Sequence, residues 1–383
     1  MPDVPKIILM LEPLGEYVKG ILEGVLKYSN IYGPWAFYRE PEGLHGVLPY
    51  LDMKKADGII GFVSETKYKD HAKKIIKSGI PTIAIEFEEQ IKGLPQIRCD
   101  SNAVGKMAAE YLLERGFEYF AYCGISGVPC SLERKQGFSE TIAKAGFETF
   151  FYEPSRHSWF REKCQWDWLT KMPKPLALMG YNDNCGRFSI EACKIMGLRV
   201  PDDVAVIGTD NDEFVNGLAW PPLSSIALGT EKAGYQAAEL LDKLMSGKEK
   251  SSEQQIFVEP THIVTRQSTD IIAISDIETS KAIQYIREHS REAIQVADVA
   301  ESVALSRRAL EKRFNKYLGR SIHHEIKRVR IEEIKRMLMD TALPVSRIAI
   351  MLGFPDANKI SRYFREEMGL TPLAYRKERI SNS

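Results

Sequence analysis

The sequence of 383 residues has no long hydrophobic run. The longest apolar run near its start covers only residues 7–11, whereas a helix that crosses a membrane needs about 20 apolar residues. A signal-peptide core also needs a longer run, and neither a basic leader nor a cleavage site accompanies this one. We therefore expect a protein without a membrane segment that stays in the cytosol.

Cysteine is scarce, and its six copies form no Cys-x-x-Cys pair. This spacing favours reduced structural thiols over a disulfide framework or a zinc site. The sequence also lacks the Gly-x-Ser-x-Gly, His-Glu-x-x-His and Gly-x-Gly-x-x-Gly motifs of common nucleophiles, zinc sites and nucleotide-binding loops. We therefore expect no catalytic residue, no metal and no cofactor, and a protein that is not an enzyme.

The formal net charge is zero, because 52 basic residues balance 52 acidic ones. The balance conceals an asymmetry: residues 306–380 hold 18 Lys and Arg against 9 Asp and Glu, so the rest of the chain is acidic. A basic segment attached to an acidic body predicts an anionic partner for the C-terminal part alone.

Residues 5–269 alternate short apolar runs, rich in β-formers, with amphipathic stretches of helix length, the pattern of a parallel α/β sheet. The expected strands are residues 6–11, 58–63, 82–86, 96–99, 119–124, 176–181 and 204–208. The expected helices are residues 17–28, 68–78, 102–115, 132–145, 185–196 and 232–245. Gly79 and Gly116 follow helix ends, where a left-handed C-cap favours glycine. Asp100 and Asp183 are expected N-caps.

Acidic residues follow three of the expected strands. Glu86, Asp183 and Asp210 stand at or just after strand ends, and ligands of open α/β sheets bind beyond the carboxyl ends of the strands. Such groups suit a polyol, because each hydroxyl both donates and accepts, and an unpaired buried partner costs about 1–3 kcal/mol. These residues therefore predict a polyol site.

Several ordered motifs in this region resemble the effector domain of the LacI/GalR family. They are residues 177–183 (Ala-Leu-Met-Gly-Tyr-Asn-Asp), 197–211, 221–226, 234–238 and 266–269 (Arg-Gln-Ser-Thr). The resemblance implies two lobes of the periplasmic-binding-protein type with a sugar cleft between them. Residues 134–138 resemble the family's Arg-x-x-Gly-Phe helix start, which implies that Arg134 contacts a sugar hydroxyl. The expected ligand-binding residues are Glu86, Arg134, Asn182, Asp183 and Asp210.

Structural roles remain open for several of these residues. Asn182 and Asp183 could cap a helix, which is the favoured role for Asp183 taken alone. Arg134 could instead pair with Glu133 or Glu140 on a solvated face. Aromatic residues at helical spacing are expected in the core rather than stacked on a sugar: Trp159, Trp166 and Trp168.

The LacI/GalR family usually carries an N-terminal helix-turn-helix, but this sequence opens at the first strand, so we expect DNA binding elsewhere. The C-terminal part repeats itself: residues 299, 300 and 303 match 348, 349 and 352, and residues 310, 314 and 319 match 360, 364 and 369. Each copy reads as two short helices joined by a tight turn, at residues 304–305 and 353–355. The pattern predicts two helix-turn-helix units, linked by one helix over residues 321–340.

The second helix of each unit is expected to read DNA, with Ser306 and Asp356 as N-caps. The residues expected to point outward and contact DNA are Arg307, Arg308, Glu311, Lys312, Asn358, Ser361, Arg362 and Arg365. Arginine can bond guanine bidentately in the major groove, and asparagine can bond adenine. A 20-residue linking helix is about 30 Å long, close to the roughly 34 Å between successive major grooves.

Residues 348–376 resemble the AraC/XylS signature, and the resemblance extends over residues 280–379. A LacI-like sensor followed by this domain is the architecture of XylR-type xylose operon regulators, which the chain resembles. The resemblance implies a homodimer that binds a double-stranded DNA operator and D-xylose, and activates pentose catabolic genes. Another monosaccharide as effector, or no small ligand at all, remains open. The expected domains are a two-lobed α/β sensor over residues 1–270, a linker over 271–279 and an all-α double helix-turn-helix domain over 280–383.

Overall fold

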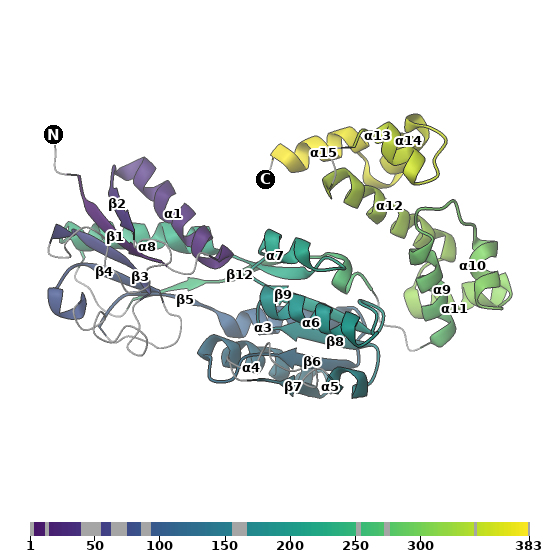
Figure 1. Ribbon diagram of the computed structural model, residues 1–383, viewed down its shortest axis with the longest axis horizontal. Helices are drawn as coiled ribbons and strands as arrows, with labels where there is room; N and C mark the ends of the chain where they lie inside the picture. The colour runs from purple at the N-terminus through teal and green to yellow at the C-terminus, as the bar shows by residue number, and fades with distance from the viewer. Residues whose placement is uncertain are drawn as a thin grey trace. The chain divides into compact units, whose positions relative to one another are not determined.

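A computed structural model describes residues 4–11, 15–39, 55–62, 75–85, 93–154, 167–249, 254–271, 276–340 and 343–381. The chain divides into two compact units, Met1–Ile271 and Ile272–Ser383 (Figure 1). The first unit combines strands and helices in two lobes, and the described part of the second contains helices alone, which confirms the predicted fold class. No helix in the described parts of the chain is long and apolar enough to cross a membrane.

The first lobe contains a six-stranded sheet with the order β11-β5-β4-β3-β1-β2. All neighbouring strands in it are parallel. The strands are β1 (Lys6–Met10), β2 (Ala36–Arg39), β3 (Gly58–Phe62), β4 (Thr82–Ile85), β5 (Gln96–Cys99) and β11 (Gln255–Val258). Helices α1 (Glu16–Tyr32) and α8 (Thr230–Met245) bury their apolar faces in the same core as strands β1, β3 and β4.

The second lobe contains a six-stranded sheet with the order β12-β10-β9-β8-β6-β7. Its strands are β6 (Tyr119–Cys123), β7 (Thr149–Tyr152), β8 (Leu176–Gly180), β9 (Val204–Thr209), β10 (Ser224–Leu228) and β12 (Pro260–Val264). Only β12 is antiparallel to its neighbour. The helices are α3 (Ser101–Glu114), α4 (Pro129–Lys144), α5 (Asp167–Lys171), α6 (Asp183–Ile195) and α7 (Glu213–Leu218). Strands β8 and β9 are buried throughout, as the central strands of a parallel sheet must be.

Each expected strand corresponds to a strand of one of the two sheets, but β2, β7, β10, β11 and β12 were not predicted. Four of these five lie at sheet edges, where exposed side chains dilute the apolar signal. The exception, β10, begins with two serines that are buried because they are hydrogen-bonded. The helix expected over residues 68–78 lies mostly outside the described residues.

The predicted caps are confirmed except for one. Gly79 and Gly116 adopt φ of +69° and +76°, and Asp100 accepts a hydrogen bond from the Ala103 amide at 3.0 Å. The prediction that Asp183 caps α6 is wrong by one residue. Asn182 is the N-cap and accepts from the Cys185 amide at 2.9 Å.

The chain passes between the two lobes three times, after β5, after β10 and after β11. Hydrogen bonds hold these crossings side by side: the Asp100 amide donates to the Val258 carbonyl at 3.0 Å, and the Gly229 amide donates to the Glu259 carbonyl at 2.9 Å. Three adjacent crossings form a hinge of the kind about which two lobes can close on a ligand.

The second unit consists of helices α9 (Ile277–Glu288), α10 (Val296–Ser302), α11 (Arg307–Leu318), α12 (Ile322–Asp340), α13 (Val345–Met351), α14 (Ala357–Met368) and α15 (Pro372–Ser381). Helix α9 begins three residues before the expected residue 280, because Asp276 caps it by accepting from the Thr279 amide at 2.9 Å. The last residues of the predicted linker are therefore helical, and residues 272–275 lie outside the described part.

The predicted repeat is confirmed in three dimensions. Leu310 and Phe314 in the first copy, like their counterparts in the second, are fully buried. The turns correspond as well, since Ala304 (φ +52°) and Gly353 (φ +68°) share the left-handed conformation. Helix α12 supplies its N-terminal half to the first core and its C-terminal half to the second, as the predicted linking helix requires.

Candidate functional site

Arg134 is buried, with 4% of its surface exposed. Its position follows from a close crossing of α3 and α4, where a Cβ on Gly105 would lie 2.1 Å from the Arg134 carbonyl. The guanidinium donates to the Tyr181 carbonyl through Nη1 and to Cys99 Sγ at 3.6 Å through Nη2. Because Cys99 ends β5 of the first lobe, Arg134 lies where the two lobes meet. Its alternative pairing with Glu133 or Glu140 is wrong, because these side chains bond Arg98 and Gln136 instead.

Asp210 follows β9 and faces Arg134, with Oδ1 4.0 Å from Arg134 Nη2. Burial raises the pKa of Asp210 to about 6; the Arg134 guanidinium opposes this rise, whereas Asp212 and Glu16 add to it. The distance is too long for a direct hydrogen bond, so each group retains capacity for a further partner.

Asp183 lies behind Asp210 and is 2% exposed. Its carboxylate accepts from the Asp212 amide at 2.7 Å, from Asn216 Nδ2 at 3.1 Å and from Ser225 Oγ at 2.5 Å. Burial and the nearby Asp210 raise the pKa of Asp183, while these hydrogen bonds oppose the rise. Asp183 therefore fixes the loop that follows β9. Direct contact between Asp183 and a ligand stays a prediction.

Of the two other expected ligand-binding residues, only Asn182 lies in the described part of the chain. Asn182 is half-buried and uses its side-chain oxygen to cap α6. Glu86 lies outside the described residues, as do Trp159 and Trp166. The remaining tryptophan of that group, Trp168, stacks on Tyr152 with 5.3 Å between ring centroids, which confirms its expected packing role.

Three residues beside the pair were not predicted: Tyr17 on α1, Cys99 at the end of β5 and Tyr181 after β8. The Tyr17 hydroxyl is buried and has no hydrogen-bond partner among the described residues. Burial and the nearby Cys99 thiol raise the pKa of Tyr17, so it remains a protonated donor. The strand-end rule could have identified Cys99 and Tyr181, but Tyr17 lies in the first turn of α1, seven residues after the end of β1.

The cluster of Tyr17, Arg134 and Asp210 presents both donors and acceptors at the meeting of the lobes. Arg134 Nε, like the Tyr17 hydroxyl, is buried without a partner in the described part of the chain. Buried polar atoms of this kind are costly unless a ligand or water completes their hydrogen bonds. A compact polyol fits this chemistry, because each of its hydroxyls can accept from Arg134 or Tyr17 and donate to Asp210.

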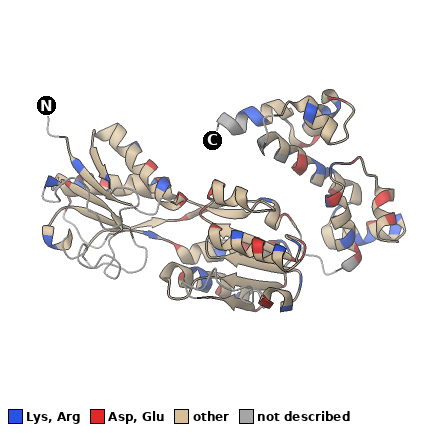
Figure 2. Ribbon diagram, in the orientation of Figure 1, with Lys and Arg blue, Asp and Glu red and all other residues tan. Residues whose placement is uncertain are grey.

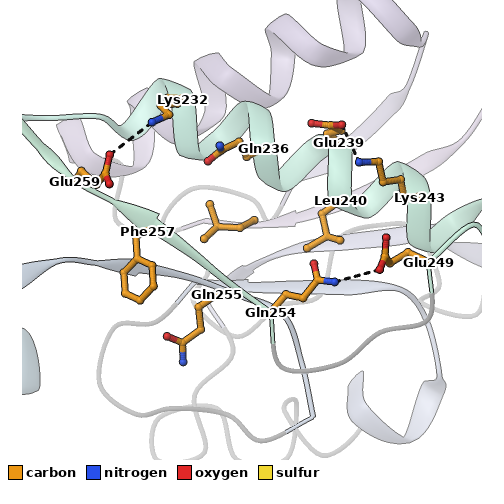
Figure 3. A pocket seen from close by; sticks show the side chains of 11 residues that line it. Lys232, Gln236, Glu239, Leu240, Lys243, Glu249, Gln254, Gln255, Phe257 and Glu259 are labelled. Carbon is orange, nitrogen blue, oxygen red and sulfur yellow. Dashed lines mark hydrogen bonds and ion pairs between the residues drawn. The ribbon is translucent and has the colours of Figure 1, made fainter.

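A pocket in the first lobe lies between α8 and β11 (Figure 3). Four of its five charged side chains form two ion pairs: Lys232 approaches Glu259 at 3.5 Å, and Lys243 approaches Glu239 at 2.8 Å. None of the expected ligand-binding residues lines it. We therefore place the candidate ligand site at Arg134 and Asp210 rather than in this pocket.

In the second unit, α11 is the second helix of the first helix-turn-helix. Ser306 caps it as predicted, accepting from the Ala309 amide at 3.3 Å. Arg307, Arg308 and Lys312 are exposed, and basic residues occur along both helix-turn-helix units (Figure 2). Glu311 is only half-exposed and accepts from the Ile322 amide at 3.4 Å, which gives it a structural bond at the start of α12.

Helix α14 occupies the corresponding place in the second helix-turn-helix. Asp356 caps it as predicted, accepting from the Lys359 amide at 2.8 Å. Asn358, Arg362 and Arg365 are exposed, and Ser361 is half-buried. On this face Arg362 pairs with Glu366 at 3.0 Å. The pair is exposed and therefore weak, so a nucleic acid can compete for Arg362.

Helix α12 sets the separation of the two candidate DNA-reading helices. Its 19 residues extend about 28 Å at 1.5 Å per residue. Arg330 donates from α12 to the Leu352 carbonyl of the second helix-turn-helix at 2.7 Å, and Glu333 of α12 accepts from Arg291, which lies between α9 and α10, at 2.8 Å. Because α12 also packs in the cores of both helix-turn-helix units, it joins α11 and α14.

Comparison with known protein families assigns both units. The family model of a periplasmic binding protein-like domain matches residues 109–269, and that of a helix-turn-helix domain matches residues 299–378. The chain is therefore a DNA-binding transcriptional regulator that joins a binding-protein-like sensor to a C-terminal helix-turn-helix domain.

The whole chain is similar to xylose operon regulatory proteins, as the sequence motifs predicted. It is 28% identical to that of Haemophilus influenzae, covering 97% of this chain and 98% of the relative. It is also 28% identical to that of Escherichia coli K12, with 97% and 96% covered. A solved structure of the xylose-binding transcription activator XylR matches with a TM-score of 0.76, 28% identity and 97% of each chain. These relatives are regulators rather than enzymes, in agreement with the expected function.

Proposed function

We propose that this protein senses D-xylose at the meeting of its two lobes and, when the sugar is bound, activates transcription from an operator. The similarity to xylose operon regulators over nearly the whole chain supports both the sugar and the activating role. The proposal also implies that the protein acts in the cytoplasm. Asp210 and Arg134 are the proposed sugar ligands, while Asn182 and Asp183 shape the site behind them.

The arrangement of Arg134 and Asp210 carries the proposal. A buried guanidinium and a carboxyl 4.0 Å apart, each with unused bonding capacity, cannot satisfy each other fully. A sugar hydroxyl placed between them would accept from Arg134 and donate to Asp210. Closing the lobes around the sugar would then exclude water and strengthen both hydrogen bonds.

We propose that α11 and α14 read two successive major-groove segments of the operator. The exposed side chains on α11 and α14 provide the contacts: Arg307, Arg308, Lys312, Asn358, Arg362 and Arg365. One chain then covers one half-site, so a homodimer would cover a complete operator with two half-sites. Glu311 and Ser361 lie at the edges of these faces and would tune base preference rather than bind phosphate.

Isothermal titration of the full chain with D-xylose, L-arabinose, D-ribose and D-glucose tests the ligand assignment. We expect D-xylose to bind most tightly, and a concentration of 100 times its Kd should stabilise the protein by about 2.7 kcal/mol. Arg134→Ala and Asp210→Ala should each abolish binding. Lys135→Ala is the matched control, because Lys135 is the next residue of α4 and pairs with Glu153 at 2.7 Å. Tight binding of another sugar alone would contradict the assignment.

A further inference from the structure

The sensor unit ends in a segment that is anchored inside the second lobe. Ser268 and Thr269 are fully buried, and Ser268 Oγ donates to the Val206 carbonyl at 2.6 Å. The Thr269 hydroxyl lies 2.7 Å from the hydroxyls of both Ser224 and Tyr111. Since the first unit ends at Ile271, these bonds fix the point at which the chain leaves the sensor.

Arg266 stands immediately before this anchored segment and connects it to the candidate sugar site. Its amide donates to Ser224 Oγ at 2.7 Å, and its Nη1 donates to the Leu223 carbonyl at 3.0 Å. Its Nη2 donates to Asn211 Oδ1 at 2.9 Å. Asn211 is the residue next to Asp210. The Arg266 side chain therefore joins the loop that carries Asp210 to the segment Ser268–Ile271, where the chain leaves the sensor.

Asp210 and Asn211, the loop residues beside the Arg266 side chain, have an unusual backbone. Asp210 and Asn211 adopt φ of +105° and +52°, a region that non-glycine residues occupy at a cost of about 1–3 kcal/mol each when the surroundings enforce it. The Asn211 amide donates to Ser225 Oγ at 3.0 Å, and Ser225 in turn bonds Asp183. The conformation therefore depends on these hydrogen bonds together, and a change at Asp210 is transmitted directly to Asn211.

We propose that Asn211 and Arg266 form a latch that couples sugar binding at Asp210 to the chain exit at Ser268–Ile271. The inference rests on the proposed function and specifies how that site regulates DNA binding. Both residues are positioning residues, because they act through Asp210 and through the exit segment rather than by touching sugar or DNA.

The physical basis is a shared backbone. In this proposal a sugar that draws Asp210 toward Arg134 also rotates the adjoining peptide, and Asn211 Oδ1 then moves relative to Arg266 Nη2. Because Arg266 also holds Leu223 and Ser224, its shift displaces the anchored segment that follows it. Sugar and operator affinities are then linked, and each must change the other by the same factor.

The test measures that factor in the full chain as the ratio of D-xylose Kd without and with DNA. The DNA is a duplex selected by the wild-type protein from a random pool. Asn211→Gly removes the acceptor while retaining the left-handed backbone. Asn211→Asp retains both acceptor and backbone preference. Arg199→Ala is the control, because it removes an arginine of the same lobe that bonds Asp203 at 2.8 Å.

We expect a wild-type factor of at least about five, the lower end of common allosteric couplings. Asn211→Gly should still bind xylose, but its factor should fall to within about twofold of one. Asn211→Asp and Arg199→Ala should retain the wild-type factor. Because the factor is a ratio, changes in the intrinsic affinity of the site cancel. An unchanged factor in Asn211→Gly would overturn the latch.

Hydrogen exchange in the sugar-free protein separates failure of the latch from failure of the proposed function. The Ser268 amide donates to the Pro222 carbonyl at 3.0 Å, so its protection reports the anchored exit. Asn211→Gly should speed exchange at residues 268–271 by about fivefold or more, whereas Asn211→Asp should not. Unchanged exchange in Asn211→Gly would reject the latch whichever sugar binds. Faster exchange in Asn211→Gly, together with a wild-type protein that does not bind xylose, would retain the latch and reject the ligand.

Discussion

At residue scale, the candidate site depends on one carboxyl and one guanidinium held in unequal surroundings. Arg134 is buried and permanently charged, whereas Asp210 remains partly exposed and has its pKa raised to about 6 by burial. Asp212 and Glu16 add negative charge nearby, and Tyr17 adds a neutral donor. Sugar affinity should therefore respond to pH in the range where Asp210 titrates.

We predict that D-xylose affinity falls about tenfold for each pH unit below 6, because protonation removes the charged acceptor. Titration calorimetry between pH 7.5 and pH 5 measures this. Asp210→Asn should bind more weakly at pH 7.5 and lose the pH dependence. A wild-type xylose affinity that is constant between pH 7.5 and pH 5 would show that Asp210 does not contact the sugar.

In the sugar-free protein, the raised pKa of Asp210 affects stability instead of affinity. As pH rises from about 3.8 to about 6, the unfolded chain has already lost the Asp210 proton while the folded protein must still lose it, so the free energy of unfolding falls.

A second residue-scale prediction concerns DNA specificity. Replacing Arg308 or Arg362 by alanine should cost about 1–3 kcal/mol at a few base positions, because each exposed guanidinium can bond a base edge. Binding to a set of single-base operator variants measures this effect. Arg199→Ala, in the sensor, is the control and should leave every affinity unchanged. An equal loss on all sequences would make the two arginines phosphate contacts instead.

At the scale of elements, glycines allow two helices of the first lobe to cross in close contact. A Cβ on Gly24 of α1 would lie 2.0 Å from the Glu231 carbonyl, and one on Gly234 of α8 would lie 2.0 Å from the Ile21 carbonyl. The α3–α4 crossing of the second lobe repeats this arrangement with Gly105 and Gly137, and it positions Arg134. Close packing of backbones therefore supports both the sensor core and the candidate site.

We predict that Gly24→Ala destabilises the sensor by about 3 kcal/mol or more, because backbone on both sides of the new Cβ must move. Gly217→Ala in α7 is the control, since nothing lies within 4 Å of its added Cβ. Tryptophan fluorescence during urea unfolding measures the sensor alone, because all five tryptophans precede residue 221. Equal midpoints for the two variants would contradict the close crossing.

The turns of the two helix-turn-helix units provide a matched pair of changes. Ala304 and Gly353 occupy equivalent left-handed positions, where alanine costs about 1–2 kcal/mol. Ala304→Gly should therefore stabilise the first unit by about 0.5–1 kcal/mol, after the entropy of a more flexible unfolded chain is included. Gly353→Ala should destabilise the second unit. Hydrogen exchange of the buried amides of α11 and α14 reports each effect, and changes of the same sign would contradict the equivalence.

The same elements show what could be predicted from the sequence. Central strands and the repeated helices carry strong apolar periodicity, so β8, β9, α11 and α14 were identified within a few residues. Edge strands lacked that signal. Arg134 and Asp210 are predicted site residues because a motif and a strand end mark them. Their separation, the isolation of the Tyr17 hydroxyl and the Asn211–Arg266 bond arise from packing between distant segments. Spacing along the chain does not encode such contacts.

At the scale of the whole molecule, sensing and DNA binding lie in separate units, each with its own core. The candidate sugar site belongs to the first unit, and the two candidate DNA-reading helices belong to the second. Any effect of sugar on DNA binding must therefore pass from the first unit to the second, and the chain exit at residue 271 is the covalent connection between them. The proposed latch at Asn211 and Arg266 supplies the first step.

We predict that the DNA-binding unit functions on its own. A fragment of residues 276–383 should bind the selected operator specifically, because α9 to α15 enclose their own apolar cores and share helix α12. Its binding should weaken as salt rises, because Lys and Arg displace counterions from phosphates. Competition with unrelated duplexes at several salt concentrations measures both properties. Only weak binding without sequence preference, by fragment and full chain alike, would contradict the assignment of α11 and α14.

The most direct test of the whole account is the affinity of the full chain for its selected operator, measured with and without saturating D-xylose beside the fragment of residues 276–383. We expect xylose to tighten operator binding by the full chain at least about fivefold and to leave operator binding by the fragment unchanged. Arg134→Ala in the full chain should bind the operator but ignore xylose. An operator affinity of the wild-type chain that xylose does not change, or a fragment that responds to xylose by itself, would contradict the account.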